Sequence, residues 1–527
     1  MAKTYRQIFG NYSTLNILFV SQPAVIALVA SGILPRTVVP FWTIALAVYV
    51  LMASLENSTV FFVRSIPFFV AIPITAGFDS LNMWRIFSGL IFLKWFWVLK
   101  PKIMPRFSRS SFILLALLLL MILSISQAQS HVLAVKRIIY FVNLSMIGIV
   151  IYDLIRKNQD FCQRIIKNVA IPTIFVALVG MVQLVSTYFM DIFQFVDFWG
   201  GVVERNMYGN VWAETAIKAN TWFAYFGNQL SLRMFSIFPD SHSFPIFMLL
   251  GLPAVMTIAL KRVTEKSGNF KTMLQSRASV IIIFIPVIFL ALILTGTRGI
   301  WAAGAASSVW AIFLIARHRM SCTPNITCRA VFAYISSFLV IFFLLFGVAY
   351  YIIASNQFMA EKDSTGLLAK RARSVLDISE TSNARRIEIW KDSIRSIIKH
   401  PLLGVGIGNF PAVVGEDLAR AKAGSSAHNL YLHIAAETGL PALILALWFL
   451  WLLLKKSHRN FLTSVTSYQL PIIIYFASLL IFLPWVLIYS LTDVAMFDER
   501  AFLLFAVTAA IISGTGKILP DNTLSNQ

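Results

Sequence analysis

The sequence is short of charge. Charged residues make up 13% of its 527 positions, where soluble domains carry about 25%. Acids are scarcer still, with 23 Asp and Glu against 44 Lys and Arg. This deficit excludes an ordinary cytosolic enzyme, and the 58% hydrophobic content excludes a disordered chain. The formal net charge of +21 does not indicate nucleic-acid binding, because the basic residues stand in short clusters between apolar runs.

Cysteines and the motifs of soluble enzymes are also scarce. Three cysteines cannot form a disulfide framework. Cys322 and Cys328 share a short basic loop whose spacing is a weak zinc signal, and we expect unpaired cytosolic thiols there. No Walker A lysine, Gly-x-Ser-x-Gly elbow or His-Glu-x-x-His motif occurs. The glycine-rich run 404–409 lacks the strand and helix of a dinucleotide fingerprint, so we expect a close-packing turn.

Long apolar runs are what the sequence has in abundance. A helix needs roughly 20 apolar residues to cross a bilayer. Fourteen candidate spans lie near residues 16–34, 38–54, 59–76, 84–99, 110–126, 132–154, 168–189, 243–260, 278–296, 299–316, 330–353, 429–454, 467–489 and 500–514. Two short early spans are open to a re-entrant or merged reading. The expected fold is therefore an all-α polytopic membrane protein with a bundle of about 12–14 transmembrane helices.

Basic residues predict the orientation of this bundle. Lys and Arg gather in alternate connections, around residues 100–109, 156–167, 261–277, 317–329 and 455–459. By the positive-inside rule these loops and both termini are cytoplasmic. The predicted segments are N-terminal spans (1–189), a first long external loop (190–242), central spans (243–353), a large external loop (354–428), C-terminal spans (429–514) and a cytoplasmic tail (515–527). The first span is not expected to be a cleaved signal peptide.

The two long external loops have the composition of folded segments. The first carries five aromatics that suit a membrane–water interface, namely Trp199, Tyr208, Trp212, Trp222 and Tyr225. The second has apolar residues from Ile387 to Ile397 at spacings of three and four, which predicts an amphipathic helix that ends at His400-Pro401. Long loops of this kind are usually functional.

Three residues at the predicted outer boundary could carry chemistry. Arg233 precedes the eighth span, Arg298 lies in the turn Thr295-Gly-Thr-Arg-Gly299, and His428 precedes Asn429 at the start of the twelfth span. A guanidinium is always charged and its planar fork of donors suits phosphate. Histidine titrates near neutrality and can accept a proton from a hydroxyl. Two arginines and a histidine could thus bind a pyrophosphate without a metal ion and activate an acceptor.

Structural alternatives remain open for each residue. Both arginines could snorkel to lipid headgroups, and the His428-Asn429 pair could cap a helix. His433 and Glu437 stand one turn apart and could be an ordinary polar pair. Arg137 lies inside a predicted span. We expect a structural or lipid-contact role for basic residues in the spans, and Arg137 is the first exception to that expectation. The loop around Arg36 contains no carboxylate, which argues against the metal-dependent lipid-linked glycosyltransferases.

Several blocks of the sequence resemble the O-antigen ligase and polymerase family. They are the segment from Arg233 to Pro239-Asp240, the turn Thr295–Gly299, the run from Arg386 to Trp390, the run from His400 to Phe410, the triplet Ala427-His428-Asn429 and the run from Glu437 to Pro441. The similarity covers roughly residues 230–445. One departure stands out, since many members have Pro-Asn where this chain has Pro239-Asp240. Fourteen spans would also exceed the commoner family number of about twelve.

The resemblance implies a helical bundle like the C-type glycosyltransferases, with a large external loop between two late spans. Members move glycans from undecaprenyl pyrophosphate to an acceptor outside the bacterial cytoplasmic (inner) membrane. Carried over by position, Arg233 and Arg298 would bind the pyrophosphate and His428 would be the general base. Further substrate-binding candidates are Arg386, Asn429, Glu437 and Arg137. No metal and no cofactor are expected.

The sequence therefore predicts an O-antigen ligase-like glycosyltransferase with an outward-facing site. Its expected partners are the undecaprenyl-pyrophosphate-linked glycan, a lipid A–core or another glycan or protein acceptor, and membrane lipids, with no nucleic acid. A repeat-unit polymerase of the same family is the first alternative. A membrane transporter of small anions or of lipid-linked glycan is the second, and an inactive scaffold of a glycan export complex is the third.

Overall fold

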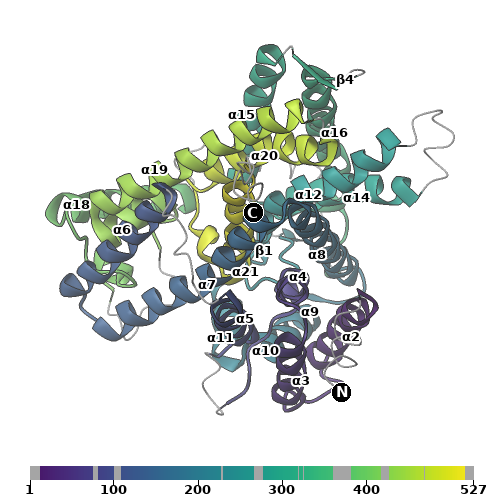
Figure 1. Cartoon of the computed structure of the whole chain (residues 1–527). Helices are drawn as coiled ribbons and strands as arrows, with labels where there is room; N and C mark the ends of the chain where they lie inside the picture. Colours follow the sequence, from purple (N-terminus) through teal and green to yellow (C-terminus); the bar gives the residue numbers. More distant parts are fainter. Residues whose placement is uncertain are drawn as a thin grey trace.

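The chain forms a bundle of helices in a computed structural model (Figure 1). The structure describes residues 12–74, 81–99, 109–226, 229–265, 277–318, 320–323, 326–359, 381–416, 426–467 and 469–516. The N-terminal part contains α2 (Tyr12–Ala30), α3 (Val38–Met52), α4 (Leu55–Ser65), η1 (Ile66–Phe68), α5 (Met83–Leu99), α6 (Arg109–Ser124), η2 (Ile125–Gln127), α7 (His131–Lys157) and α8 (Gln159–Ser186). In Figure 1 helices α2 to α5 form one end of the molecule.

The first long loop is folded. It contains α9 (Ile192–Val196), a π-helix η3 (Asp197–Glu204), α10 (Arg205–Tyr208), α11 (Asn210–Ala219) and an antiparallel hairpin of β1 (Phe223–Phe226) and β2 (Gln229–Leu232). Trp222 is 1% exposed and stacks on Phe235 with ring centroids 4.3 Å apart. Trp199 and Tyr208 are buried as well, whereas Trp212 is exposed. These three buried rings form the interior of the folded loop.

The remaining elements run to the C-terminus. They are α12 (Ser243–Glu265), α14 (Arg277–Leu294), α15 (Arg298–Arg317), β3 (Ser321–Thr323), β4 (Ile326–Thr327), α16 (Cys328–Ala354), α18 (Thr381–Lys399), η4 (Phe410–Val414), α19 (Leu430–Thr466), α20 (Leu470–Tyr489), η5 (Ala495–Phe497) and α21 (Glu499–Gly514). Helix α18 is the amphipathic helix that the spacing of apolar residues predicts. The large loop's residues 360–380 and 417–425, and the tail from residue 517 onward, lie outside the described residues.

Eight helices in the described part of the chain are long and apolar enough to cross a membrane. They lie at Arg109–Gln127, His131–Lys157, Gln159–Ser186, Ser243–Leu260, Arg298–Arg317, Val331–Ala354, Leu430–Thr466 and Leu470–Tyr489. Three shorter apolar helices lie at Thr14–Ala30, Val38–Met52 and Ile282–Leu294. The predicted all-α polytopic membrane fold is confirmed.

The predicted span at residues 59–76 is helical only in its first part. Helix α4 ends at Ser65 and the chain continues through the short η1 turn into extended backbone, where Ala71 pairs with Asn82. Pro67 and Pro73 each remove a backbone donor that a continuing helix would use. Hydropathy alone could not predict where this buried segment changes from helix to extended backbone.

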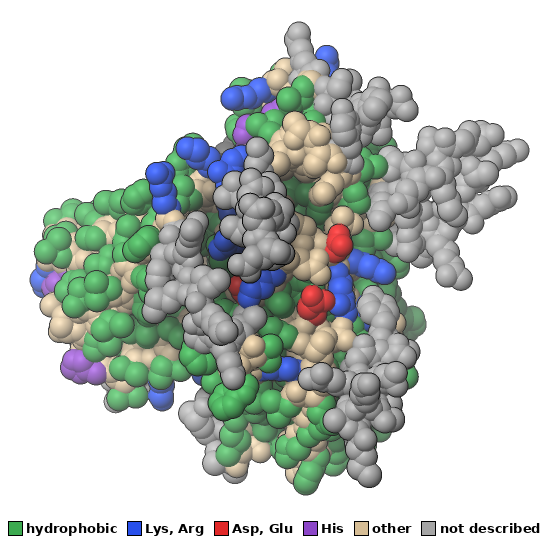
Figure 2. All heavy atoms as spheres, in the orientation of Figure 1, with side chains coloured by type: hydrophobic (Ala, Val, Ile, Leu, Met, Phe, Trp, Pro, Cys, Tyr) green, Lys and Arg blue, Asp and Glu red, His purple; other side chains and the backbone are tan. Residues whose placement is uncertain are grey.

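Burial distinguishes the centre of the bundle from its lipid-facing rim. Helices α12 and α20 are buried along nearly their whole length and pack on each other, in the middle of Figure 1. A helix that is apolar on all sides belongs in such a centre. Helix α6 instead exposes Phe112, Leu114 and Leu119. Figure 2 shows hydrophobic side chains over most of the described surface of one face, as contact with lipid tails requires.

Cys328 is disulfide-bonded, whereas Cys162 is a buried free thiol. The expectation of unpaired thiols is therefore wrong for Cys328. The β3–β4 hairpin turns the chain back on itself, with the Cys328 amide donating to the Met320 carbonyl at 2.8 Å. That return brings the ends of the loop within the short separation that a disulfide needs.

A glycine allows the two central helices α8 and α12 to pack closely. A Cβ atom on Gly251 would lie 2.9 Å from the Cβ atom of Thr173, so no rotation of Thr173 could relieve the contact. We expect Gly251→Ala to destabilise the protein by about 1–3 kcal/mol through overpacking. Thermal unfolding of the detergent-purified protein would register this as a lowered Tm.

Gly347→Ala in α16 is the matched control, because a Cβ atom there meets nothing within 4 Å. An unchanged Tm in Gly251→Ala, equal to that of the control, would contradict the close α8–α12 packing.

Candidate active site

Arg233 is enclosed by the turn that contains Arg298. The Arg233 Nε atom donates to the Thr295 carbonyl at 3.1 Å, and its Nη2 atom donates to the Thr297 hydroxyl at 3.2 Å. Gly296 has φ +61°, and a Cβ atom there would lie 3.2 Å from the Arg233 Cγ atom. The Thr-Gly-Thr turn therefore holds the stem of Arg233 and needs glycine to do so.

Arg298 is the first residue of α15 and follows Thr297 directly. Its neighbour Gly299 packs against Thr492, whose Cβ atom would lie 3.2 Å from a Cβ added to the glycine. The start of α15 thus lies against the segment that follows α20. The two predicted arginines are brought together through one turn, and Gly299 at its end also packs against Tyr489 and Thr492.

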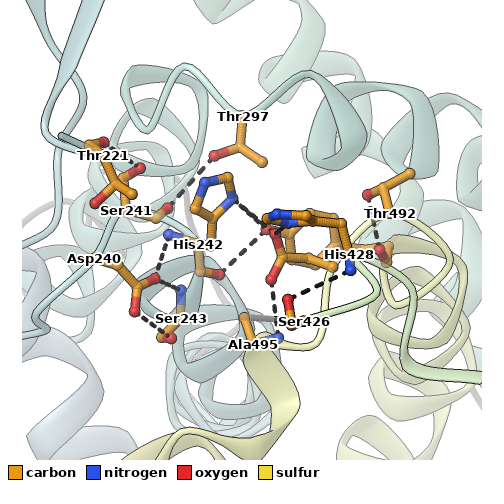
Figure 3. A network of polar contacts seen from close by, with 12 residues as sticks. Thr221, Asp240, Ser241, His242, Ser243, Thr297, Ser426, His428, Thr492 and Ala495 are labelled. Carbon is orange, nitrogen blue, oxygen red and sulfur yellow. Dashed lines mark hydrogen bonds and ion pairs between the residues drawn. The ribbon is translucent and has the colours of Figure 1, made fainter. Parts of the chain in front are cut away.

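Two histidines share one carboxylate at this place. His242 Nδ1 lies 3.1 Å from Asp493 Oδ2, and His428 Nδ1 lies 3.8 Å from the same oxygen. Asp493 is 8% exposed, whereas the His428 side chain is 39% exposed. In Figure 3 His242 lies between Thr297 and His428. His428 is therefore the histidine that an acceptor could reach.

A chain of contacts joins the arginine turn to the carboxylate. Arg233 Nη2 lies 3.4 Å from His242 Nε2, and a guanidinium can only donate. His242 Nε2 therefore accepts, which leaves the proton on Nδ1, 3.1 Å from Asp493 Oδ2. Tyr489 donates its hydroxyl to the His242 carbonyl at 3.3 Å. Arg233, His242, Asp493 and His428 thus form one connected polar group.

Burial sets the charge state of this group. It lowers the pKa of His242 to about 3, although the Asp493 carboxylate partly opposes that shift. Burial also raises the pKa of Asp493, but His242, His428 and Arg386 together lower it more, so its pKa lies below the ordinary value. At neutral pH His242 is neutral and Asp493 is ionised. Arg386 of α18 is close enough to act on both residues electrostatically.

The capping interpretation is correct for Asn429 and not for His428. Asn429 Oδ1 accepts hydrogen bonds from the amides of Tyr431 and Leu432 and so caps α19. His428 has φ +45°, which turns the chain just before the cap. The same turn frees the imidazole of His428 to face Asp493, so its side chain is not used by the helix.

Asp240 is also a helix cap. Its Oδ1 atom accepts from the amides of His242 and Ser243, at 2.8 and 2.7 Å, and its Oδ2 atom accepts from the Ser243 hydroxyl. Burial raises the pKa of Asp240, and the bonds from Ser243 partly offset this rise. The departure from Pro-Asn at residues 239–240 therefore places an acid on helix amides, and Asn could accept from the same groups.

His433 and Glu437 join two other blocks of the sequence. His433 Nε2 lies 3.5 Å from Glu437 Oε1, and that oxygen accepts from the Phe410 amide at 3.1 Å. Gly404 and Gly439, both with positive φ, pack against backbone of the opposite block. The glycine-rich run is thus a close-packing turn, and the polar pair ties it to α19. Glu437 has no contact with the Asp493 group.

Arg137 lies elsewhere again. Its guanidinium carbon is 5.1 Å from the Tyr140 ring centroid and 5.0 Å from that of Phe141. The residues that sequence reasoning missed are His242 and Asp493. Asp493 is an isolated acid in a short connection after an apolar span, and His242 follows the Pro239-Asp240 motif by two positions. Only the fold shows that the two meet.

Comparison with known proteins agrees with the resemblance. Residues 281–447 match the family model of O-antigen ligase. These residues are an O-antigen ligase domain. The match includes Arg298, Arg386, His428, Asn429 and Glu437, and it ends before Asp493. No curated protein matches the chain.

The family and the spans together give the broad assignment. Several of the chain's helices can cross a membrane, and residues 281–447 are similar to O-antigen ligases, a family of lipopolysaccharide biosynthesis. Arg233, His242 and Asp493 lie outside the matched residues, so the O-antigen ligase domain by itself contains only part of the polar group.

The role of Asp240 can be tested by two substitutions. Asp240→Ala removes the acceptor for two helix amides and should cost about 1 kcal/mol of stability. Asp240→Asn keeps an oxygen that can accept, and we expect a Tm close to that of the wild type. Equal losses in both variants would show that the negative charge, rather than the cap, is what Asp240 contributes.

Proposed function

We propose that the protein transfers a glycan from undecaprenyl pyrophosphate to an acceptor hydroxyl on lipid A–core or a similar acceptor, on the outer side of the cytoplasmic membrane. The observation that carries this proposal is the contact group of Arg233, His242, Asp493 and His428 beside the Arg298 turn. It combines fixed cations with a partly exposed base at the ends of membrane helices. Those are the two functions that such a transfer needs.

Arg233 and Arg298 would bind the donor pyrophosphate. Charge grows on the phosphate oxygens as the bond from the anomeric carbon to the phosphate oxygen breaks. Arginines that are already in place stabilise that charge, and removal of one such donor typically costs about 3–4 kcal/mol. The hydrogen bonds of Arg233 to Thr295 and Thr297 support this role, because they fix the guanidinium before the donor arrives.

His428 would accept the proton of the acceptor hydroxyl. Its Nδ1 atom faces Asp493, so Nε2 is the nitrogen left for the acceptor. The acceptor oxygen then bonds to the anomeric carbon from the side opposite the phosphate, which inverts that centre. Undecaprenyl pyrophosphate leaves with the bonding electrons, and the proton stays on His428. Asp493 would orient the imidazole and stabilise its charged form, as carboxylates do in other histidine-based sites.

His242 is a poor candidate for the base. It is buried and both its nitrogens have partners, Arg233 on one side and Asp493 on the other. We assign it a positioning role between donor site and carboxylate. Arg386 would add positive charge near the same group. The energy for transfer comes from the donor's phosphoester bond, so the proposed reaction needs no nucleotide and no metal ion.

A repeat-unit polymerase would use the same polar group with a different acceptor. A transporter would place its ionisable residues at the bilayer midplane, in broken helices. The residues of this group instead lie at the starts of α12, α15 and α19 and just after α20. That placement at helix ends favours transfer over transport.

A transfer assay in lipid tests the proposal. The purified protein would receive an undecaprenyl-pyrophosphate glycan and lipid A–core, with chelator present. We expect His428→Ala to lower kcat about 10²–10⁴-fold as a lost general base, and Arg298→Ala to lower it about 10²–10³-fold. Product on lipid A–core identifies a ligase, and a ladder on undecaprenyl identifies a polymerase. Anion flux without any transfer would contradict the enzyme.

Two signals disagree about the orientation of the bundle. The loop at 317–329 is basic, which places it in the cytoplasm, yet Cys328 is disulfide-bonded, and disulfides are rare there. We give more weight to the basic residues, because five connections agree with one another. The proposed orientation has both termini cytoplasmic and the site facing outward.

Reporter fusions decide between these signals. A green fluorescent protein fused at the C-terminus should fluoresce, because it folds in the cytoplasm, whereas a periplasmic phosphatase fused there should be inactive. The opposite pair of results would place the 317–329 loop in the oxidising compartment and the proposed site on the cytoplasmic face.

A further inference from the structure

A second pair of arginines lies outside the Asp493 group, on α5 and α7. The Arg85 guanidinium carbon is 5.0 Å from the Trp84 ring centroid and 5.8 Å from that of Tyr140. The Arg137 guanidinium carbon lies 5.1 Å from the same Tyr140 ring. Two cations from different helices therefore share one aromatic ring, and both are half-buried.

Neither arginine has an acidic partner among the residues that the structure describes. Their recorded side-chain contacts are with rings, and the Arg85 Nε atom is buried without a hydrogen bond. The nearby carboxylate of Glu499 is occupied, since Trp84 Nε1 and Asn82 Nδ2 donate to its two oxygens at 2.6 and 3.0 Å. Contact with a ring is worth about 0.5–2 kcal/mol, and it leaves the guanidinium N–H donors available to an anion.

The ring between the arginines is fixed in place. Tyr140 donates its hydroxyl to the Phe497 carbonyl at 2.8 Å, and Phe497 also lies 5.7 Å from the Arg137 guanidinium carbon. Phe497 ends the short helix η5, whose Ala495 amide donates to Asp493 at 3.0 Å. The five residues from Asp493 to Phe497 thus connect this arginine pair to the carboxylate between the two histidines.

Position argues for the acceptor rather than the donor. Arg233 contacts His242 beside α12, and Arg298 begins α15. Arg85 and Arg137 lie beyond Phe497, on α5 and α7, and a Cβ atom on Gly408 would lie 3.2 Å from the Arg137 Cβ atom. The glycine-rich run therefore packs against Arg137. An acceptor held there could extend to His428 from the side opposite the donor arginines.

We propose that Arg85 and Arg137 form a second anion site, which binds a phosphate or carboxylate group of the acceptor glycolipid. This inference rests on the proposed transfer function and adds a chemical requirement, namely that the acceptor is anionic. Guanidinium groups suit such anions because they present planar N–H pairs and stay charged. The aromatic rings exclude water and strengthen the interaction.

Binding measurements on the full-length protein in nanodiscs of zwitterionic lipid test the site without relying on catalysis. The probes are lipid A–core with its phosphates, the same glycolipid after phosphatase treatment, and phosphatidylglycerol. We expect Arg85→Gln and Arg137→Gln each to weaken binding of the phosphorylated probe about 10-fold, as loss of a charge-assisted contact predicts. Binding of the dephosphorylated probe should not change.

Lys136→Gln is the matched control, because it removes the same charge from the neighbouring position of α7, where the side chain is exposed. Arg85→Lys and Arg137→Lys serve if the Gln variants unfold, and they should retain part of the affinity. Binding of undecaprenyl pyrophosphate should be unchanged in the Arg85 and Arg137 variants and weakened by Arg233→Gln.

Three results would overturn the acceptor site. They are equal affinity of all variants for phosphorylated lipid A–core, an effect on donor binding alone, or equally tight binding of phosphatidylglycerol, which would indicate a site for bulk lipid. Failure of transfer in the wild type with these binding results intact would refute the proposed function and leave the anion site standing. Normal transfer by the wild type, with no difference in binding among the variants, would refute the anion site and leave the proposed function standing.

Discussion

The ionised carboxylate of Asp493 is the constraint on which the rest of the site depends. A buried charge is costly unless it has partners, and Asp493 obtains them from three separate parts of the chain. His242 precedes α12, His428 precedes α19, and the Ala495 amide belongs to η5. Through His242 the carboxylate is also linked to Arg233 and thus to the turn at the start of α15. Asp493 thus connects the starts of α12, α15 and α19.

Close backbone approach makes this convergence possible. Gly299 lets α15 approach Thr492, and Gly296 lets the turn close over the stem of Arg233. On the other side of the site, the Leu440 amide donates to the Pro401 carbonyl and the Val405 amide donates to the Ala436 carbonyl. These bonds break α19 at Gly439, whose φ is +87°. The glycine-containing blocks of the O-antigen ligase domain therefore act structurally, and the arginine and histidine beside them are left for chemistry.

The sequence was sufficient for the parts of this arrangement that repeat along the chain. Apolar runs predicted the helices, and the spacing from Ile387 to Ile397 predicted α18. Family blocks pointed to Arg233, Arg298 and His428. The sequence could not predict which residues from distant parts of the chain meet in space. Asp493 and His242 are about 250 positions apart, and neither stands in a pattern that would mark it. The end of the helix at Ser65 could not be predicted for a similar reason, because hydropathy is the same for a buried extended segment and for a helix. Asn429 rather than His428 caps α19, a distinction that depends on backbone angles.

The central claim is that Asp493 acts on catalysis through His428, and a double-mutant cycle on kcat tests it most directly. The variants are His428→Ala, Asp493→Asn and the pair, assayed for transfer after their folding is verified. If the two residues act as a unit, the double variant should lose about as much activity as His428→Ala alone, as coupled catalytic groups do. Losses that multiply would contradict the account, because they would mean that Asp493 and His428 contribute independently.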